Sequence, residues 1–371
     1  MIKRIRIRLM AAGMATMLPL ALWTGHAAAQ SKEIVLGAML PLTGSAAQIG
    51  LEEQNGIQFA TDKVNAAGGI RGYKIRIVYE DTQGKPDLGV LAFNRLVDLH
   101  QVSGIFTAYS SVTLATAPLA TRKKVFVLNP AAQTSKLATA SPYLVNTISL
   151  AKDEVSIIAK YAAGKLGKKA AVYYDSGSVG IDLRDEFKAA FLAAGGTIVA
   201  DEAVEFGNTN LRPTLLKIAA AKPDFVFMAA TTGPGVTGDQ ISQIPDYPTA
   251  IGTSFFAPFK NYPVTVYHTL VKSSVTGETE KEFNAKFKTP DMPFFSREYA
   301  NASQIMFKVI DYLLEKGRPV TGENLRTALF EVKSFDTPNG KISFDTNTAR
   351  REVEIHKLTP AGRAVVEKIA H

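Results

Sequence analysis

The stretch IVLGAMLPLTG, residues 34–44, decides the fold class. Its first seven residues are almost all apolar, which is typical of a buried strand, and Pro41 ends that strand. Thr43-Gly44-Ser45 then begins a helix that runs to about Asn65 and closes at Ala66-Ala67-Gly68-Gly69. A strand, a short turn and a helix form the first half of a βαβ unit.

The same alternation continues through most of the chain and indicates parallel sheets covered by helices on both faces. In the first half, we predict strands at residues 34–40, 73–80, 104–107 and 125–128. The alternation restarts after Ser149, with strands predicted at residues 170–174, 197–204, 225–229 and 250–252. The sequence therefore predicts an α/β fold with two doubly wound lobes.

The last part of the chain changes its pattern. From about Gly277 the sequence predicts two long helices, residues 279–288 and 299–316, and then a hairpin at Pro338-Asn339-Gly340. The alternation of predicted strands and helices alone leaves open whether this part of the chain forms a third domain or returns to the first lobe.

The N-terminus is typical of a secretion signal. Basic residues precede an apolar run at residues 9–23, and Ala27-Ala28-Ala29 follows it, so we predict cleavage after Ala29. The run is shorter than the roughly 20 residues of a membrane-spanning helix, which disfavours an N-terminal anchor. The chain has no Cys, so disulfides and a lipid anchor on an N-terminal Cys are both excluded. We expect a soluble, exported mature protein.

Composition and charge exclude several classes of function. With 46% apolar and 20% charged residues, the chain is not of the disordered type. Half of the formal net charge of +8 comes from Lys3, Arg4, Arg6 and Arg8 in the leader, and the remaining charges of both signs are interspersed. We therefore expect no nucleic-acid partner.

Motifs of catalysis are weak, and we predict that the protein is not an enzyme. Residues 233–238, GPGVTG, match the spacing G-x-G-x-x-G, but an isolated match of this kind has a high false-positive rate. The histidines are scattered, there are no cysteines, and no set of nucleophile, base and oxyanion donors can be assembled. We expect no metal and no cofactor.

Ligands of doubly wound sheets bind at the carboxyl ends of the strands. Three predicted strands end in small, hydroxyl-bearing or turn-forming residues without charge, namely residues 41–45, 108–111 and 129–135. Hydroxyls and backbone N–H groups at helix starts bind anions, although serine and threonine are also common helix caps. The convergence of three such segments favours an anion site.

Four motifs in this order resemble the periplasmic branched-chain-amino-acid-binding proteins, the extracytoplasmic solute receptors of ABC importers. They are residues 34–44, Asn65-Ala66-Ala67-Gly68-Gly69-Ile70-Arg71-Gly72, Glu80-Asp81-Thr82 and Asn129-Pro130-Ala131-Ala132. The resemblance implies a type I periplasmic binding fold, in which two Rossmann-like lobes joined by three crossings close over a ligand. It also implies a monomer in the periplasm whose partner is an ABC permease in the inner membrane.

The resemblance also implies the organisation of the chain. Residues 1–29 are the signal peptide, residues 30–149 with 277–350 form the first lobe, and residues 150–276 with 351–371 form the second. The long helices after Gly277 thus return to the first lobe, and the chain crosses again near the strand at residues 352–358. A receptor that serves a sensor kinase instead of a transporter has the same sequence features.

The family's contacts to the ligand carboxylate can be carried over by position. The serine after the third strand corresponds to Ser110, with Ser111 as the fallback. The backbone after the Asn-Pro-Ala-Ala turn corresponds to Ala131, Ala132 and Gln133, where Gln133 replaces the usual threonine. The resemblance therefore implies an intact clamp for a carboxylate.

The rest of the family's site departs from its pattern. Aromatic contacts of the family fall on Ile49, Val179 and Thr231. The acidic residue that pairs with the ligand's α-ammonium falls near Ser254, and there is no Asp or Glu between Asp246 and Glu278.

A buried ammonium group without an anionic partner costs several kcal/mol. We therefore expect a carboxylate ligand without an α-ammonium, an organic or aromatic acid, with Phe255 and Phe256 as a wall for a ring. Asp239 and Asp175 are alternative ammonium partners, which keeps amino acids as the second ligand class.

Overall fold

The first sheet of the protein is parallel throughout. The computed structural model describes residues 32–205, 207–229, 234–272, 277–337 and 340–369. Within them, five strands pair in the order β2-β1-β3-β4-β5. These strands are β1 (Glu33–Leu40), β2 (Lys74–Asp81), β3 (Gly104–Thr107), β4 (Phe126–Asn129) and β5 (Leu144–Asn146).

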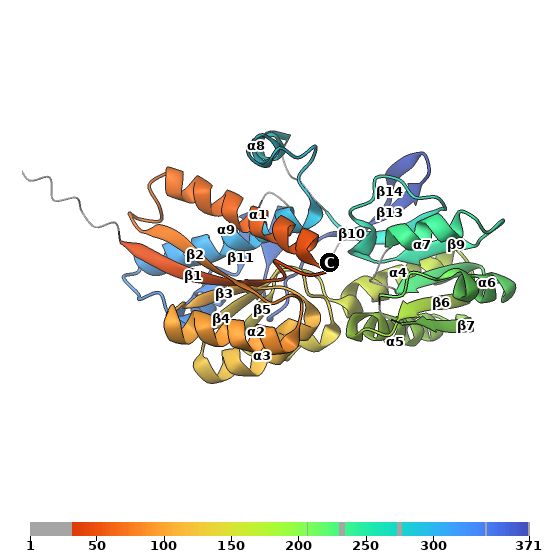
Figure 1. Cartoon of the computed structure of the whole chain (residues 1–371), viewed down its shortest axis with the longest axis horizontal. Coiled ribbons are helices and arrows are strands. Elements are labelled where there is room, and N and C mark those ends of the chain that lie inside the picture. The colour runs from red at the N-terminus through yellow and green to blue at the C-terminus, as the bar shows by residue number, and fades with distance from the viewer. Residues whose placement is uncertain (1–31, 206, 230–233, 273–276, 338–339, 370–371) are drawn as a thin grey trace, which may run out of the picture. The chain divides into compact units, whose positions relative to one another are not determined.

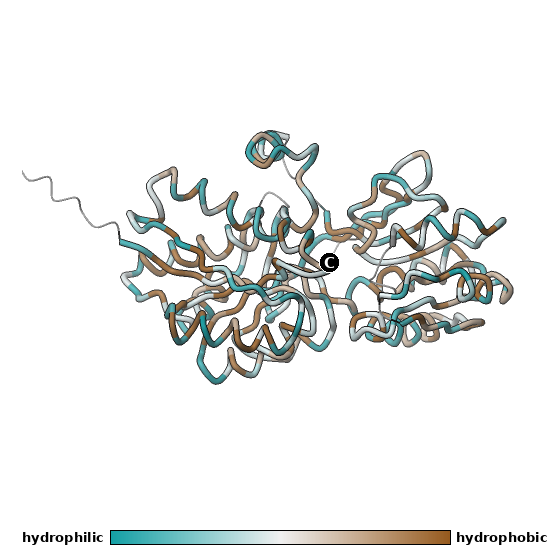
Figure 2. Tube along the Cα trace, in the orientation of Figure 1, coloured by the Kyte–Doolittle hydropathy of each residue, from teal (hydrophilic) through white to brown (hydrophobic). Residues whose placement is uncertain are grey.

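Helices cover both faces of this sheet (Figure 1). One face carries α1 (Ala47–Ala66) and α9 (Phe294–Glu315), which lie side by side, and the other carries α2 (Pro86–Asn94) and α3 (Ser110–Lys123). β1 is apolar without alternation because both of its faces are buried: Leu40 packs toward α1 and α9, whereas Met39 packs on the side of α2 and α3. Figure 2 shows hydrophobic residues along both the strands and the helices of the chain.

The second sheet is mixed. Its seven strands pair in the order β14-β13-β10-β9-β8-β6-β7, and only the pairs β10–β13 and β13–β14 are antiparallel. The strands are β6 (Lys169–Asp175), β7 (Thr197–Val204), β8 (Phe225–Ala229), β9 (Thr249–Gly252), β10 (Val266–Val271), β13 (Val353–Thr359) and β14 (Gly362–Ile369). The helices of this part are α4 (Ala151–Lys165), α5 (Ser178–Ala193), α6 (Arg212–Ala220) and α7 (Pro234–Ile241).

The segment after Gly277 shares its core with the first sheet. It contains α8 (Gly277–Phe287), α9, α10 (Gly322–Val332) and the hairpin of β11 (Ser334–Thr337) and β12 (Gly340–Ser343). Side chains of α9, α10 and both hairpin strands pack in one cluster with those of β1. Of the predicted hairpin turn, Pro338 and Asn339 lie outside the described residues.

The predicted α/β class with two helix-covered sheets is confirmed. The sequence pattern missed β5, β10, α10 and β14. β14 is an edge strand whose residues are mostly exposed, so it has no apolar signature. Among the described residues, no helix is both long and apolar enough to cross a lipid bilayer.

Candidate functional site

The predicted carboxylate clamp starts at the turn between β3 and α3. Tyr109 occupies the N-cap position with a φ of 64°, and its side chain does not cap the helix. Ser110, the first residue of α3, is buried, and its Oγ accepts a long hydrogen bond of 3.4 Å from the backbone N of Thr134. Because the first N–H groups of α3 have no side-chain cap, this helix end suits an anion.

Two groups hold this turn in place. The Tyr299 hydroxyl on α9 donates to the carbonyl of Thr107, the last residue of β3, at 2.7 Å. On the helix side, both the backbone N and the hydroxyl of Thr113 donate to the carbonyl of Tyr109, at 2.9 and 2.8 Å. The turn that presents Ser110 is therefore fixed from both ends.

The Asn-Pro-Ala-Ala turn is closed by its own asparagine. Asn129 Oδ1 accepts from the backbone N of Ala131 at 3.2 Å and of Ala132 at 2.7 Å, and Asn129 Nδ2 donates to Asn146 Oδ1 at 2.8 Å. The structure thus pairs these two amides with Asn129, where the sequence predicted contacts to a ligand. In this structure these two amides are therefore hydrogen-bonded within the loop.

The loop after β1 is organised in the same way by Asp81, at the end of β2. Its carboxylate accepts from the backbone N of Leu42 at 2.9 Å and of Thr43 at 3.2 Å, and from the Thr43 hydroxyl. Burial acts to raise the pKa of Asp81, but these hydrogen bonds and one from Gln83 outweigh it and hold the pKa below its usual value. The polar groups of residues 42 and 43 therefore serve the loop itself.

A buried acid that sequence reasoning missed accepts hydrogen bonds from Ser254. Glu154, in the first turn of α4, accepts with Oε2 from the Ser254 backbone N and the Thr269 hydroxyl, both at 2.8 Å. Its Oε1 accepts from the Ser254 hydroxyl at 3.0 Å and from Gln133 Nε2 at 2.8 Å. Burial raises the pKa of Glu154, although the hydrogen bonds from Ser254 and Thr269 act against the rise.

Gln133 and Ser254 are thereby brought together. Gln133 Nε2 also donates to Ser254 Oγ at 3.0 Å, and both side chains are almost fully buried. Ser254 thus uses its backbone N and its hydroxyl inside this network. No local sequence signal predicts it, because Glu154 and Ser254 are 100 positions apart.

Three further carboxylates bear on the question of an ammonium partner. Asp182, on α5, accepts from the Thr134 hydroxyl at 2.9 Å and from the backbone N of Ser135 at 2.7 Å. Since the backbone N of Thr134 donates to Ser110 Oγ, Asp182 lies one residue away from Ser110 in this hydrogen-bond network. Asp175 is buried and accepts from the backbone N of Gly177 in the turn before α5, whereas Asp239 is exposed on α7. Asp182 is the acid that the sequence analysis did not consider.

A family model described as periplasmic binding protein matches residues 33–240 of this sequence. The chain belongs to the periplasmic binding protein family. The predicted resemblance is confirmed, and members of this family are transport binding proteins.

Individual relatives of this periplasmic binding protein agree with that result. The Leu/Ile/Val-binding protein BraC3 of Rhizobium johnstonii is 26% identical over 84% of this chain and 87% of the relative. LivJ of Streptococcus pneumoniae, a branched-chain amino acid transporter substrate binding protein solved with isoleucine, superposes with a TM-score of 0.79 at 22% identity and covers 91% of this chain and 100% of its own.

A third similar protein is a solute binding protein of an ABC transporter from Rhodopseudomonas palustris BisB5, solved with 3,4-dihydroxy benzoic acid. Its TM-score is 0.76 at 25% identity, and the match covers 91% of this chain and 96% of the other. The type I periplasmic binding fold with two lobes is therefore shown for this chain.

The remaining predicted contacts lie at helix starts. Ile49 is half-buried in the first turn of α1, where the next residue, Gly50, approaches Pro41 so closely that a Cβ would lie 2.1 Å from its carbonyl oxygen. Ser111 is half-buried in α3, and Val179 is half-buried at the start of α5, where it packs on the core of the second sheet. Thr231 lies outside the described residues.

The two phenylalanines after β9 have different environments. Phe255 is half-buried, whereas Phe256 is buried and packs edge-on against Tyr262 with ring centroids 5.3 Å apart. Phe256 therefore belongs to the core of the second sheet, and only Phe255 retains a partly exposed face for the predicted wall.

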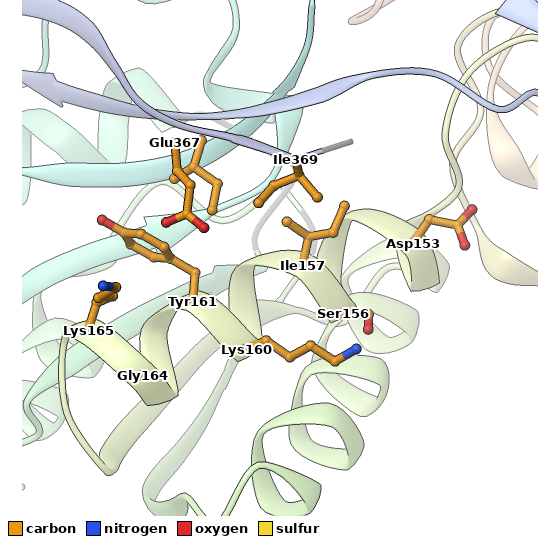
Figure 3. Close-up of a pocket in the computed structure, with 10 residues that line it drawn as sticks. Asp153, Ser156, Ile157, Lys160, Tyr161, Gly164, Lys165, Glu367 and Ile369 are labelled. Atoms are coloured by element: carbon orange, nitrogen blue, oxygen red, sulfur yellow. The ribbon is translucent and has the colours of Figure 1, made fainter. Parts of the chain in front are cut away.

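A cavity of about 490 Å³ lies outside the predicted site, between α4 and the strands β13 and β14 (Figure 3). Its lining is mixed: Ile157 and Ile369 face each other, the Tyr161 ring lies next to the Glu367 carboxylate, and charged side chains of α4 complete the wall. It contains none of the predicted ligand contacts.

Proposed function

We propose that this protein is the extracytoplasmic solute-binding receptor of an ABC importer and binds a small organic or aromatic carboxylate without an α-ammonium group. The observation that carries the proposal is the uncapped start of α3, where the buried Ser110 hydroxyl lies beside the first N–H groups of the helix. The similar protein with 3,4-dihydroxy benzoic acid supports an aromatic acid as the ligand.

The proposal includes the organisation of the chain. Residues 1–29 are removed after Ala29 on export to the periplasm, residues 30–149 with 277–350 form the first lobe, and residues 150–276 with 351–371 form the second. The lobes close over the ligand, and the closed monomer is read by an inner-membrane permease. The protein itself performs no catalysis.

The ligand class follows from the charges around Ser254. No Asp or Glu lies between Asp246 and Glu278, and each oxygen of Glu154 already accepts two hydrogen bonds. An ammonium group at this position would have to displace buried donors or stay unpaired, which costs several kcal/mol. A ligand without that group avoids this cost.

Amino acids are the second candidate because of one observation. The Asp182 carboxylate lies at Thr134 and Ser135, next to the predicted clamp, and is placed to pair with an ammonium group. The name of the relative BraC3, a Leu/Ile/Val-binding protein, points in the same direction.

Thermal unfolding of the mature protein, refolded to remove carried-over ligand, tests the proposal. The panel contains benzoate, 3,4-dihydroxybenzoate, 4-methyl-2-oxopentanoate and leucine, and an external dye reports unfolding because the only Trp lies in the leader. A ligand at about 100 times its Kd adds about 2.7 kcal/mol of stability. Stabilisation by the acids and none by leucine is expected; stabilisation by leucine supports the second candidate, and no stabilisation overturns both.

A substitution at the clamp locates the carboxylate. Ser110→Ala is expected to weaken binding of the acid about tenfold or more, because it removes a hydroxyl that bonds a charged group. Ser156→Ala on α4, away from the proposed clamp, is the matched control and should bind like the wild type. Unchanged binding by Ser110→Ala would show that the carboxylate docks elsewhere.

A further inference from the structure

The backbone of Gln133 differs from that of the two alanines before it. The backbone N–H groups of Ala131 and Ala132 donate to Asn129, whereas no group among the described residues accepts from the backbone N of Gln133. Only 5% of the Gln133 surface is exposed, and a backbone N–H without an acceptor is rare in a residue this buried. This N–H is therefore available to a ligand carboxylate.

The side chain of Gln133 is held in one orientation by acceptors. Its Nε2 donates to Glu154 Oε1 at 2.8 Å and to Ser254 Oγ at 3.0 Å, and the Ser149 carbonyl oxygen lies 3.4 Å from it. A carbonyl oxygen and a carboxylate can only accept, so the amide nitrogen must face them. The reversed amide would place its oxygen against two other acceptors.

Glu154 is a fixed acceptor for this amide. It is 1% exposed in the first turn of α4, and its Oε2 accepts from the Ser254 backbone N and the Thr269 hydroxyl, both at 2.8 Å. The Gln133 carbonyl also accepts from the backbone N of Ala151, at the start of the same helix, at 2.6 Å. Gln133 is thus bound to α4 through both its backbone and its side chain.

The next residue along the chain reaches the proposed clamp, since the backbone N of Thr134 donates to Ser110 Oγ. We propose that Glu154 is a positioning residue for this clamp, which rests on the function proposed above: by holding the Gln133 amide, it fixes the direction in which the Gln133 backbone N–H donates to the ligand carboxylate. Glu154 acts on the ligand only through Gln133.

Two substitutions of similar size break this link from opposite ends. Gln133→Met removes the amide and keeps the length of the side chain. Glu154→Gln turns one carboxylate oxygen into an NH2 group. The backbone N–H of Ser254 cannot turn away from Oε2, so the NH2 group is expected in place of Oε1. There it faces Gln133 Nε2 and cannot accept from it.

The matched control is a glutamine that holds a different loop. Gln240, on α7, donates with Nε2 to the Thr209 carbonyl at 2.7 Å and accepts from the backbone N of Leu211 at 3.0 Å. Gln240→Met removes the same kind of amide contact, and Gln240 is not among the predicted ligand contacts.

The test is the Kd for the acid that the panel identifies, measured by calorimetry on variants that urea titrations show to be folded. Gln133→Met and Glu154→Gln should each bind about tenfold more weakly than the wild type. The double variant should also bind about tenfold more weakly, because the link can be lost only once. Gln240→Met should bind within about twofold of the wild type.

The failure of this role can be told apart from the failure of the proposed function. If the wild type binds an acid and folded Gln133→Met binds it as tightly as Gln240→Met does, the positioning role is wrong and the receptor function stands. The same conclusion follows if the double variant binds about a hundredfold more weakly, because the two losses are then independent. If no compound of the panel binds the wild type, the proposed function fails and the positioning role fails with it.

Discussion

Two serines that follow strands of this periplasmic binding protein differ in how their polar groups are hydrogen-bonded. Ser110, after β3, makes one long hydrogen bond of 3.4 Å, and the helix that it begins has no side-chain cap. Ser254, after β9, directs its backbone N and its hydroxyl to Glu154. The Ser110 hydroxyl therefore keeps hydrogen-bonding capacity that a ligand can use. The polar groups of Ser254 do not, because they already donate to the buried Glu154.

Gln133 connects these two regions. It follows the Asn129 turn of the first sheet, and its side chain donates to Glu154 and Ser254 near the second sheet. Its carbonyl also accepts from the backbone N of Ala151 at the start of α4, at 2.6 Å. The clamp region is therefore connected to α4 through a buried polar network. The following predictions compare the region of Ser254 with the region of Ser110.

The largest effect is expected at Glu154. Glu154→Ala leaves the Ser254 backbone N, the Ser254 and Thr269 hydroxyls and Gln133 Nε2 buried without their acceptor. Each unsatisfied buried donor costs about 1–3 kcal/mol, so the free energy of unfolding should fall by about 3–5 kcal/mol or more in urea titrations.

The control for this substitution lies on the same helix. Lys160→Ala changes an exposed side chain of α4 and should alter the free energy of unfolding by less than about 0.5 kcal/mol. If Glu154→Ala is no less stable than Lys160→Ala, the network around Ser254 contributes nothing and the contrast with Ser110 fails.

An intermediate effect is expected from the pH dependence of His268, on β10 next to Thr269. Burial lowers the pKa of His268 to about 3, and the positive charge of Arg363 acts in the same direction. The unfolded chain binds this proton near pH 6.5 and the folded protein does not, so the free energy of unfolding falls as the pH decreases from about 6.5 toward 3.

His268→Gln isolates this contribution. The variant lacks the titrating ring, so its deficit in stability relative to the wild type should shrink by about 1–3 kcal/mol between pH 7 and pH 4 in urea titrations. If the difference in the free energy of unfolding between the variant and the wild type stays constant over this pH range, other groups cause the loss of stability in acid. Asp81 of the first sheet would be tested next.

The smallest effect is expected at Asp182. Asp182→Asn keeps an oxygen that accepts from Thr134 and Ser135, so stability should change by less than about 1 kcal/mol. The loss of a negative charge beside the clamp should tighten binding of an organic acid a few-fold in calorimetry. A large loss of affinity would instead show that Asp182 pairs with a cationic group of the ligand.

The elements that the sequence predicted correctly are those with strong local patterns. β3, β7 and β8 have the predicted bounds because each is rich in apolar or β-branched residues and lies between clear turn signals. β5 has only three residues and β14 is mostly exposed, so neither shows a recognisable apolar pattern in the sequence, and both pair with a neighbouring strand.

The sequence by itself determined the order of strands and helices, the family, and the residue types that stand at the strand ends. The tertiary structure decided which of their polar groups are already bonded: Asp81 takes the amides of Leu42 and Thr43, and Glu154 takes those of Ser254 across 100 positions. The reason is physical, since a buried donor must find an acceptor. The acceptor lies on a segment that is distant in the sequence and that the fold brings close. Local sequence patterns therefore do not predict it.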